Sequence, residues 1–197
     1  MPEIIYNRLN VSGLRSESKK LLDAVRGDKY EIGEGILGID FSKVISIPKD
    51  VHTLDIPYWC DEHWGTKQNA SDVVIIDGED DYTILFKSED YSPTAVVETL
   101  SDRFPLLHLQ LAYVNEGLDF ANIVRYTRGD ELFRDELSSG AAKFLLEQIN
   151  NEYNESYNQW VEVTSNGDLL DVDDGMEPIS DKASNKSFSK RGGIDLD

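Results

Sequence analysis

The chain has 197 residues, a length that fits one domain with room for an appendage. Its 38 acidic residues against 19 basic ones give a formal net charge of −19. A surface this negative repels phosphate backbones and anionic lipid headgroups, so we expect neither direct nucleic-acid binding nor membrane binding. The same field attracts basic protein surfaces, although a high net charge also serves simply to keep a protein soluble.

Cysteine usage and hydropathy predict a cytoplasmic location. The single cysteine, Cys60, excludes an internal disulfide and suits a reducing compartment. Residues 1–8 lack the basic start and long apolar run of a signal peptide. The longest uninterrupted aliphatic stretch, Val73–Ile76, is far too short to cross a membrane.

The first third of the chain predicts a strand, a helix and a long insert. Apolar and polar residues alternate over 5–11, which indicates a half-buried strand whose apolar side is interrupted by Asn7. A helical stripe follows, with Ser16 as the expected N-cap and Gly27 as the expected residue just after its C-terminus. Residues 28–70 predict a mostly irregular insert, with a short strand possible only around 44–47.

The middle of the chain predicts a hairpin, a helix and two strands. Two β-rich runs, 73–76 and 82–87, flank an Asp-Gly turn signal. Ser92 is the expected cap of a helix with Pro93 at its first position, and that helix stops before Pro105. Alternating patterns over 107–114 and 120–126 then indicate two more strands.

The end of the chain predicts one more helix and a tail. The helix runs from about 138 to 157, with one face formed by Phe144, Leu145, Ile149 and Tyr153. Residues 165–197 are too polar to bury an apolar core, so we expect a polar, flexible tail. This tail holds eight acids and four bases, which leaves −15 of the net charge on residues 1–164.

The order of elements predicts an α+β fold. Strand, helix, hairpin, helix and strand in succession are the ferredoxin-like pattern, an antiparallel sheet with its helices on one face. Here that pattern occupies residues 1–164, with the insert at 28–70 and an additional C-terminal strand and helix.

A thiol and an imidazole lie close together in the insert. Cys60 and His63 are three residues apart, so on a helical turn they could pair as a nucleophile and its base. The alternative is that Cys60 is a buried apolar group and His63 a solvated one, and this alternative is favoured because sequence proximity is weak evidence for such geometry. No second Cys/His cluster completes a zinc site, and we expect no metal or cofactor.

Two further motifs do not fit the sites they resemble. Gly33–Gly38 spells G-x-G-x-x-G, but an extended stretch follows it where a dinucleotide fold requires a helix. The acidic run over 168–175 lacks the ligand spacing of a calcium loop and its closing Glu.

The aromatic and acidic residues near the hairpin suggest two surfaces. Tyr82, Phe86 and Tyr126 could stack RNA bases on the sheet, but basic surroundings are absent and a packed role is favoured. Acids beside the hairpin are the predicted partner-binding residues, although isolated exposed acids are more often simply solvated. They are Asp77, Glu79, Asp80, Asp81, Glu89 and Asp90.

Six short stretches together indicate a family. They are Asn7–Gly13, Asp40–Pro48, Trp64–Ala70, Ser92-Pro93, Phe104-Pro105 and Glu116–Ala121. In order and spacing they resemble the YubB-type ferredoxin-like domain family of plasmids and phages, over about two thirds of the chain. The sequence WGTKQNA at 64–70 is the most specific piece. The family usually has Trp-Cys where this chain has Ile5-Tyr6, and a tryptophan in place of Gln68.

The resemblance implies the fold and a mobile-element origin, with no established activity to transfer. Its matching residues suggest a polar pocket, whose members would be Asn7, Trp64, Lys67, Asn69 and Glu116. The alternative is structural, and it is favoured: Asn7 would satisfy the backbone of an irregular buried segment around 64–70.

Charge and resemblance lead to two functional hypotheses. The first is a phage- or plasmid-encoded accessory protein in the host cytoplasm that binds and inhibits a host protein. Its most concrete form is an anti-defence inhibitor, of the anti-CRISPR or anti-restriction type, that mimics DNA on a basic, nucleic-acid-binding surface. The alternative is a small enzyme or ligand-binding protein that uses Cys60–Asn69. The sequence leaves the oligomeric state open.

Overall fold

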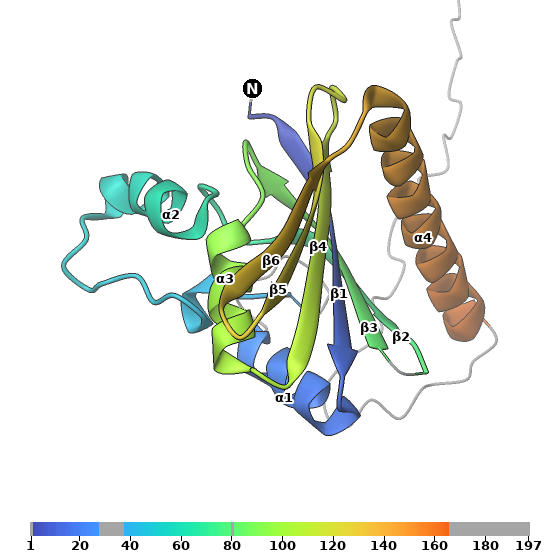
Figure 1. The fold of residues 1–197 in the computed structure, drawn as a ribbon, viewed down its shortest axis with the longest axis horizontal. Helices are drawn as coiled ribbons and strands as arrows, with labels where there is room; N and C mark the ends of the chain where they lie inside the picture. Colours follow the sequence, from blue (N-terminus) through green and yellow to red (C-terminus); the bar gives the residue numbers. More distant parts are fainter. Residues whose placement is uncertain (1, 28–37, 80, 166–197) are drawn as a thin grey trace, which may run out of the picture.

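A six-stranded antiparallel sheet organises the chain in the computed structural model, which describes residues 2–27, 38–79 and 81–165 (Figure 1). The strands follow the order β2-β3-β1-β4-β5-β6 across the sheet. Their bounds are β1 Ile4–Gly13, β2 Ser71–Asp77, β3 Asp81–Glu89, β4 Leu107–Asn115, β5 Ala121–Thr127 and β6 Asp130–Glu136. The α-helices are α1 Arg15–Val25, α2 Ile56–Trp64, α3 Thr94–Arg103 and α4 Ser139–Ser165.

The predicted ferredoxin-like α+β fold is confirmed. β1 pairs antiparallel with both β3 and β4, and β2 pairs with β3, so four strands follow the order β4-β1-β3-β2 with α1 and α3 as their crossovers. β5 and β6 extend the sheet beyond β4 through two further antiparallel pairings. No helix of the described part is long and apolar enough to cross a membrane.

The main core lies between the sheet and the helices α1, α2 and α3. Alternation over β1 places Ile5, Leu9 and Val11 on this side, where all three are buried. Apolar stripes of α1 and α3 pack on the same side, including Leu21 and Leu100. Each such side chain contributes about 1.5–3 kcal/mol through its removal from water, which makes this side the principal source of stability.

Helix α4 covers the opposite face of the sheet. Leu145 and Ile149 are buried against the second cluster of apolar side chains, which includes Ala112 and Val114 of β4. The prediction of helices on one face therefore holds for α1 and α3, and the C-terminal helix adds a third layer (Figure 1). The prediction that Phe144 shares a face with Leu145 and Ile149 is wrong, because its side chain is 68% exposed while theirs are buried.

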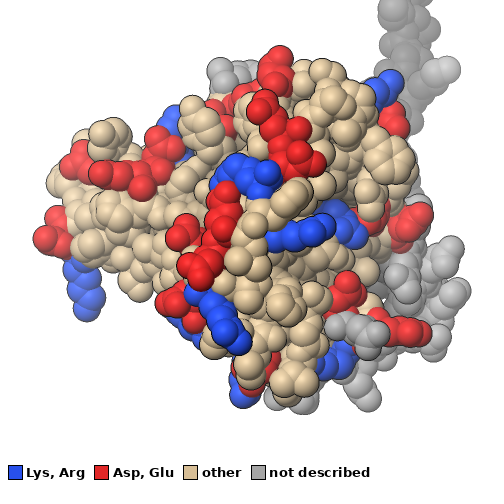
Figure 2. All heavy atoms as spheres, in the orientation of Figure 1, with Lys and Arg blue, Asp and Glu red and all other residues tan. Residues whose placement is uncertain are grey.

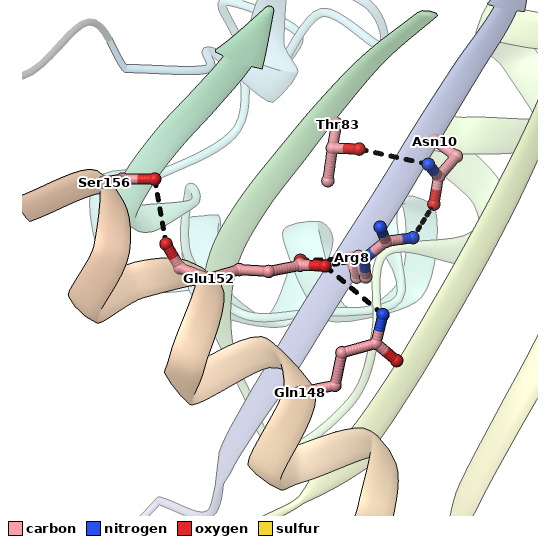
Figure 3. A network of polar contacts seen from close by, with 6 residues as sticks. All are labelled: Arg8, Asn10, Thr83, Gln148, Glu152 and Ser156. Carbon is pink, nitrogen blue, oxygen red and sulfur yellow. Dashed lines mark hydrogen bonds and ion pairs between the residues drawn. The ribbon is translucent and has the colours of Figure 1, made fainter. Parts of the chain in front are cut away.

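A polar network fixes the position of α4 on β1 (Figure 3). Arg8 Nε donates to Glu152 of α4 at 2.8 Å, and this ion pair is only about one fifth exposed on either side. The Arg8 guanidinium also donates to Asn10, whose amide donates to Thr83 Oγ1 at 3.1 Å. Gln148 of α4 donates to Glu152 at 3.3 Å. The network joins two neighbouring strands to one turn of the helix.

The predicted helix caps are wrong. Helix α1 has Leu14 at its N-cap, so Ser16 already lies inside the helix. At the other end, the backbone becomes extended at Arg26, which forms a β-bridge with Ile39. Ser92 does not cap α3, because its hydroxyl donates to the Asn7 side chain at 2.7 Å. At Ser92 a tertiary contact therefore takes the place of the local capping hydrogen bond.

The insert holds more helix than predicted and no strand at 44–47. Two 3-10 turns, Phe41–Lys43 and Thr53–Asp55, precede α2, which projects from the body of the molecule (Figure 1). Gly65 ends α2 in the left-handed conformation, with φ of 81°, which glycine adopts without strain. Residues 33–37 of the predicted glycine motif, the acidic run over 168–175 and the predicted tail from 166 onward lie outside the described residues.

Candidate functional site

Asn7 anchors the inside of the fold. Its side chain is fully buried and its amide donates to Ile5 O at 3.1 Å, to Ser88 Oγ at 2.9 Å and, more weakly, to Phe86 O. Its carbonyl oxygen accepts from Ser92 Oγ. No described buried side-chain nitrogen or oxygen lacks a hydrogen-bond partner, so Asn7 offers no spare group to a ligand.

The WGTKQNA segment is a strap that ties the insert to the sheet. Trp64 Nε1 donates to Ile45 O at 2.9 Å, and Thr66 Oγ1 donates to Glu89 O at the same distance. Asn69 accepts from the backbone of Phe41 at 2.7 Å. Two other side chains of the strap donate hydrogen bonds to acids: Gln68 donates to Glu89, and Lys67 donates to Asp90.

The five predicted pocket residues therefore do not form one pocket. Asn7 and Trp64 are buried anchors, and Asn69 bonds to the insert. Lys67 pairs with Asp90 at 2.5 Å, a contact that raises the pKa of Lys67 and lowers that of Asp90. Glu116 is exposed after the end of β4, where its backbone N–H donates to Ile4 O at 3.0 Å.

Cys60 and His63 lie on one helix but do not pair. The Cys60 side chain is buried, and burial raises the pKa of its thiol, which disfavours the nucleophilic thiolate. His63 is exposed, stacks on Trp59 with ring centroids 4.1 Å apart, and places Nδ1 2.8 Å from Trp59 O. His63 therefore does not act as the adjacent base that nucleophilic catalysis by this thiol would require.

The predicted acids divide into two separate groups. Asp77, Glu79 and Asp81 lie at the β2–β3 turn, whereas Glu89 and Asp90 lie at the other end of β3. Eight residue steps of strand place the groups about 27 Å apart. Cations or amides already contact part of each group: Arg15 reaches Asp77 at 2.5 Å, and the strap reaches the other two. Asp80 lies outside the described residues.

The candidate RNA-stacking aromatics are packed, as favoured from the sequence. Tyr82, Phe86 and Tyr126 are all buried in the core beneath α1 and α3. Burial raises the pKa of Tyr126 to about 12, and the negative charges of Glu131 and Glu98 act in the same direction. A stacking surface would need these rings to face solvent.

A surface that sequence reasoning missed lies at the far edge of the sheet, on β6. All seven residues of β6, DELFRDE, are exposed, and four of them are acidic. Arg134 donates to both carboxylate oxygens of Glu131, at 2.9 and 2.6 Å, and this contact lowers the pKa of Glu131. Asp130, Asp135 and Glu136 form no ion pair with any described residue.

A bulge gives β6 two exposed apolar residues. The pairing of β5 with β6 shifts between Arg125 and Tyr126, which leaves Leu132 as the additional residue. Leu132 is 65% exposed and Phe133 is 43% exposed, with the Arg125 guanidinium 5.1 Å from the Phe133 ring centre.

A shallow groove adjoins the start of β6. Its volume is about 420 Å³, and it is open to solvent. It is lined by Pro105, Leu106, His108, Thr127, Arg128, Asp130 and Leu132. We call the exposed side chains of Asp130–Glu136 together with this groove the β6 surface.

Acids of α3 extend the negative charge around the β6 surface. The turn at Gly129 packs on the end of α3, where its N–H donates to Ser101 Oγ at 2.8 Å. Asp102 of α3 is exposed beside this turn, and Glu98 is exposed on the preceding turn of the same helix. Figure 2 shows acidic side chains in a band over β6 and α3, interrupted by basic ones. The surface is therefore predominantly acidic, with apolar groups inside the band.

One sequence signal could have revealed β6. Residues 127–130, Thr-Arg-Gly-Asp, follow a clear strand, and Gly129 supports a two-residue hairpin turn with positive φ at Arg128 and Gly129. The pattern of apolar and polar residues does not indicate this strand. All seven residues of β6 are exposed, so apolar and polar residues do not alternate along it.

Comparisons with known proteins give little functional information. No family model matches the chain, and no curated protein matches it. Among solved structures, the chain is similar to the crystal structure of a protein api92 from Yersinia pseudotuberculosis, described with the family model DUF1281. The match has 11% identity and a TM-score of 0.49, and it covers 70% of this chain and 99% of that one. At this level of similarity, nothing about the function of this chain follows from that protein.

Proposed function

We propose that this protein is a non-catalytic binding protein whose β6 surface holds an extended, basic segment of a partner protein. The observation that carries the proposal is the combination, on one edge strand, of three acids that form no ion pair with a described residue and exposed apolar side chains beside a groove. Basic side chains of the segment would meet Asp130, Asp135 and Glu136, while an apolar side chain would meet Leu132 and the groove.

The open edge of the sheet supports this mode of binding. β6 pairs with β5 on one side, and no described strand pairs with its other side. Backbone N–H and C=O groups on such an edge can add a strand from another chain, and the side chains then select which strand is accepted.

Charge favours a basic partner over a second copy of this chain. Two copies of β6 would bring Asp130, Asp135 and Glu136 against like charges, which is unfavourable for directly opposed strands. A segment rich in Lys or Arg would instead gain electrostatic attraction, which also accelerates association.

The family resemblance and the net charge suggest a more specific role. We propose that the protein is a phage- or plasmid-encoded accessory protein and that its partner is a host protein with a basic, nucleic-acid-binding surface. Occupation of that surface would inhibit the partner, as an anti-defence inhibitor does. The net charge of −19 supports this proposal, because a nucleic-acid-binding surface attracts acidic polymers.

The test is capture of a partner with matched charge variants. The purified full chain is immobilised, and proteins retained from host lysate are identified and re-purified for affinity measurement. The site variant is D130N/D135N/E136Q. The control is D50N/D55N/E62Q, which removes the same charge from exposed positions on the insert.

We expect one partner whose affinity falls at least tenfold in the site variant and changes less than threefold in the control. That affinity should also weaken as salt rises, because exposed charges are screened over about 8 Å at physiological ionic strength. Equal losses in the two variants would reduce the interaction to non-specific charge attraction, and the absence of any partner at low salt would also refute the proposal.

A further inference from the structure

The charges of the C-terminal segment are separated into two blocks. Residues 166–181 contain six acids and no base, whereas residues 182–194, KASNKSFSKRGGI, contain four bases and no acid. The second block also carries an aromatic residue, Phe188, between its lysines. The molecule as a whole has a net charge of −19, so this basic block carries the opposite sign of charge to the acidic domain that precedes it.

We propose that residues 182–194 of the same chain bind the β6 surface and cover it until a partner displaces them. This inference rests on the proposed function, since it names the regulation of that same surface. The four bases, Lys182, Lys186, Lys190 and Arg191, complement the β6 acids that form no ion pair within the described part of the chain. Phe188 matches the apolar part of the groove formed by Leu106 and Leu132.

The chain is long enough for this contact. Helix α4 ends at Ser165, so sixteen residues separate it from Lys182. An extended chain covers about 3.4 Å per residue, which gives these residues a reach of about 55 Å. A compact domain of this size is roughly 40 Å across, so this reach exceeds the straight-line distance from one side of the domain to the other.

Covalent attachment makes the intramolecular contact stronger than its charges alone would suggest. A tethered segment acts at an effective concentration in the millimolar range, so even a weak contact is substantially occupied. If the segment covers the surface in nine molecules of ten, the apparent affinity for a partner falls about tenfold. Neutralising the basic block should therefore tighten partner binding by that factor.

The contact can be tested without a partner, by paramagnetic relaxation on the full chain. A nitroxide is attached at Ser187→Cys in a Cys60→Ala background, and the amide signals of the isotope-labelled protein are recorded. The block variant is K182Q/K186Q/K190Q/R191Q, and the matched control is D168N/D171N/D173N/D174N. A mixture of labelled and nitroxide-bearing molecules separates contact within one chain from contact between two.

We expect broadening of amides over Asp130–Glu136 and around the groove, unchanged in the acid-block control and lost in the basic-block variant. The broadening should also vanish at about 1 M salt, where screening extends only about 3 Å. Absence of broadening, its persistence in the basic-block variant, or its appearance only between molecules would overturn the inference. If broadening is absent but D130N/D135N/E136Q still loses the captured partner, only the tail contact fails. If broadening is present and that variant keeps the partner, the proposed function fails instead.

Discussion

Asn7 shows how a single polar residue fixes the centre of this fold. It lies on the buried side of β1 among apolar neighbours, and four hydrogen bonds connect it to its own strand, to β3 and to the loop before α3. In a medium of low polarity each unmet group costs free energy, so the hub is stable only while all its partners are present.

Replacing Asn7 by Ala should lower the free energy of unfolding by about 2–4 kcal/mol, because the change leaves buried donors and acceptors unpaired. Urea unfolding of the full chain measures this. Asn10→Ala is the matched control: Asn10 lies on the same strand but faces the other side and is only partly buried, so a loss below about 1 kcal/mol is expected. Similar losses in the two variants would contradict the role of Asn7 as a hub.

Asp90 gives a prediction for acidic pH. Its hydrogen bond from Lys67, followed by the one from the Glu3 backbone at 3.0 Å, holds its pKa below the usual value. The folded state therefore binds fewer protons at Asp90 than the unfolded state does. The resulting stability is present above the unfolded pKa of about 3.9 and is lost as the pH falls through the lowered folded value.

Asp90→Asn preserves the shape and the hydrogen bond from Glu3 but removes the charge. Asn also tolerates the positive φ of 62° at this position. We expect the variant to be less stable than the parent at pH 6, and the difference to shrink as the pH falls through the lowered pKa of Asp90. Urea midpoints measured across this range test it, and a difference that is independent of pH would show that the charge plays no part.

At the scale of elements, α4 turns a two-layer fold into a three-layer one. Ile149 is completely buried against the second face of the sheet, one turn of helix from Leu145. Without α4, the apolar side chains of β1, β3 and β4 on that face would be exposed to water. The ion pair between Arg8 and Glu152 sets the position of the helix along this face.

Ile149→Ala should destabilise the protein by about 2–5 kcal/mol, the range for a truncated side chain in a packed core. Phe144→Ala, on the exposed side of the same helix, should change the stability by less than about 0.5 kcal/mol. Guanidinium unfolding compares the two. A larger effect at Phe144 than at Ile149 would mean that the helix packs through the other side.

The sequence predicted most strands because their environments differ on the two faces. β1 alternates between a buried and a less buried side, and the Asp-Gly signal locates the β2–β3 turn. β6 was not predicted because none of its residues is buried, so its sequence does not alternate between apolar and polar residues. The cap at Ser92 was predicted wrongly for a different reason. Its local sequence is typical of a helix N-cap, but its hydroxyl donates to Asn7, 85 positions away, and no local pattern reveals such a contact.

The candidate site shows the same limit. The strap at 64–70 is the most distinctive piece of sequence, yet its side chains support the fold. The acids beside the hairpin look continuous in sequence, but the length of β3 separates them. The β6 surface depends on which strand is last in the sheet, a property of topology that local composition does not encode.

For the whole molecule, the distribution of charge decides how it associates. The face drawn in Figure 2 mixes acids with bases, and acidic side chains gather over β6 and α3 as well as over the projecting α2. A negative field of this kind accelerates encounters with basic partners, whereas the apolar groups of Leu132 and the groove would determine how long a complex lasts. Raising the salt concentration should therefore slow association more than it accelerates dissociation, and stopped-flow kinetics with the captured partner measures both rates.

Amide hydrogen exchange, with and without the captured partner, tests the binding role of the β6 surface most directly. Outer N–H groups of an edge strand exchange quickly when no strand pairs with them, and no described strand pairs with the outer edge of β6. A bound basic segment should protect amides over Asp130–Glu136 and around the groove, and leave α2 unchanged. Protection on the projecting insert, or none on β6 while the partner is bound, would contradict the assignment of this surface.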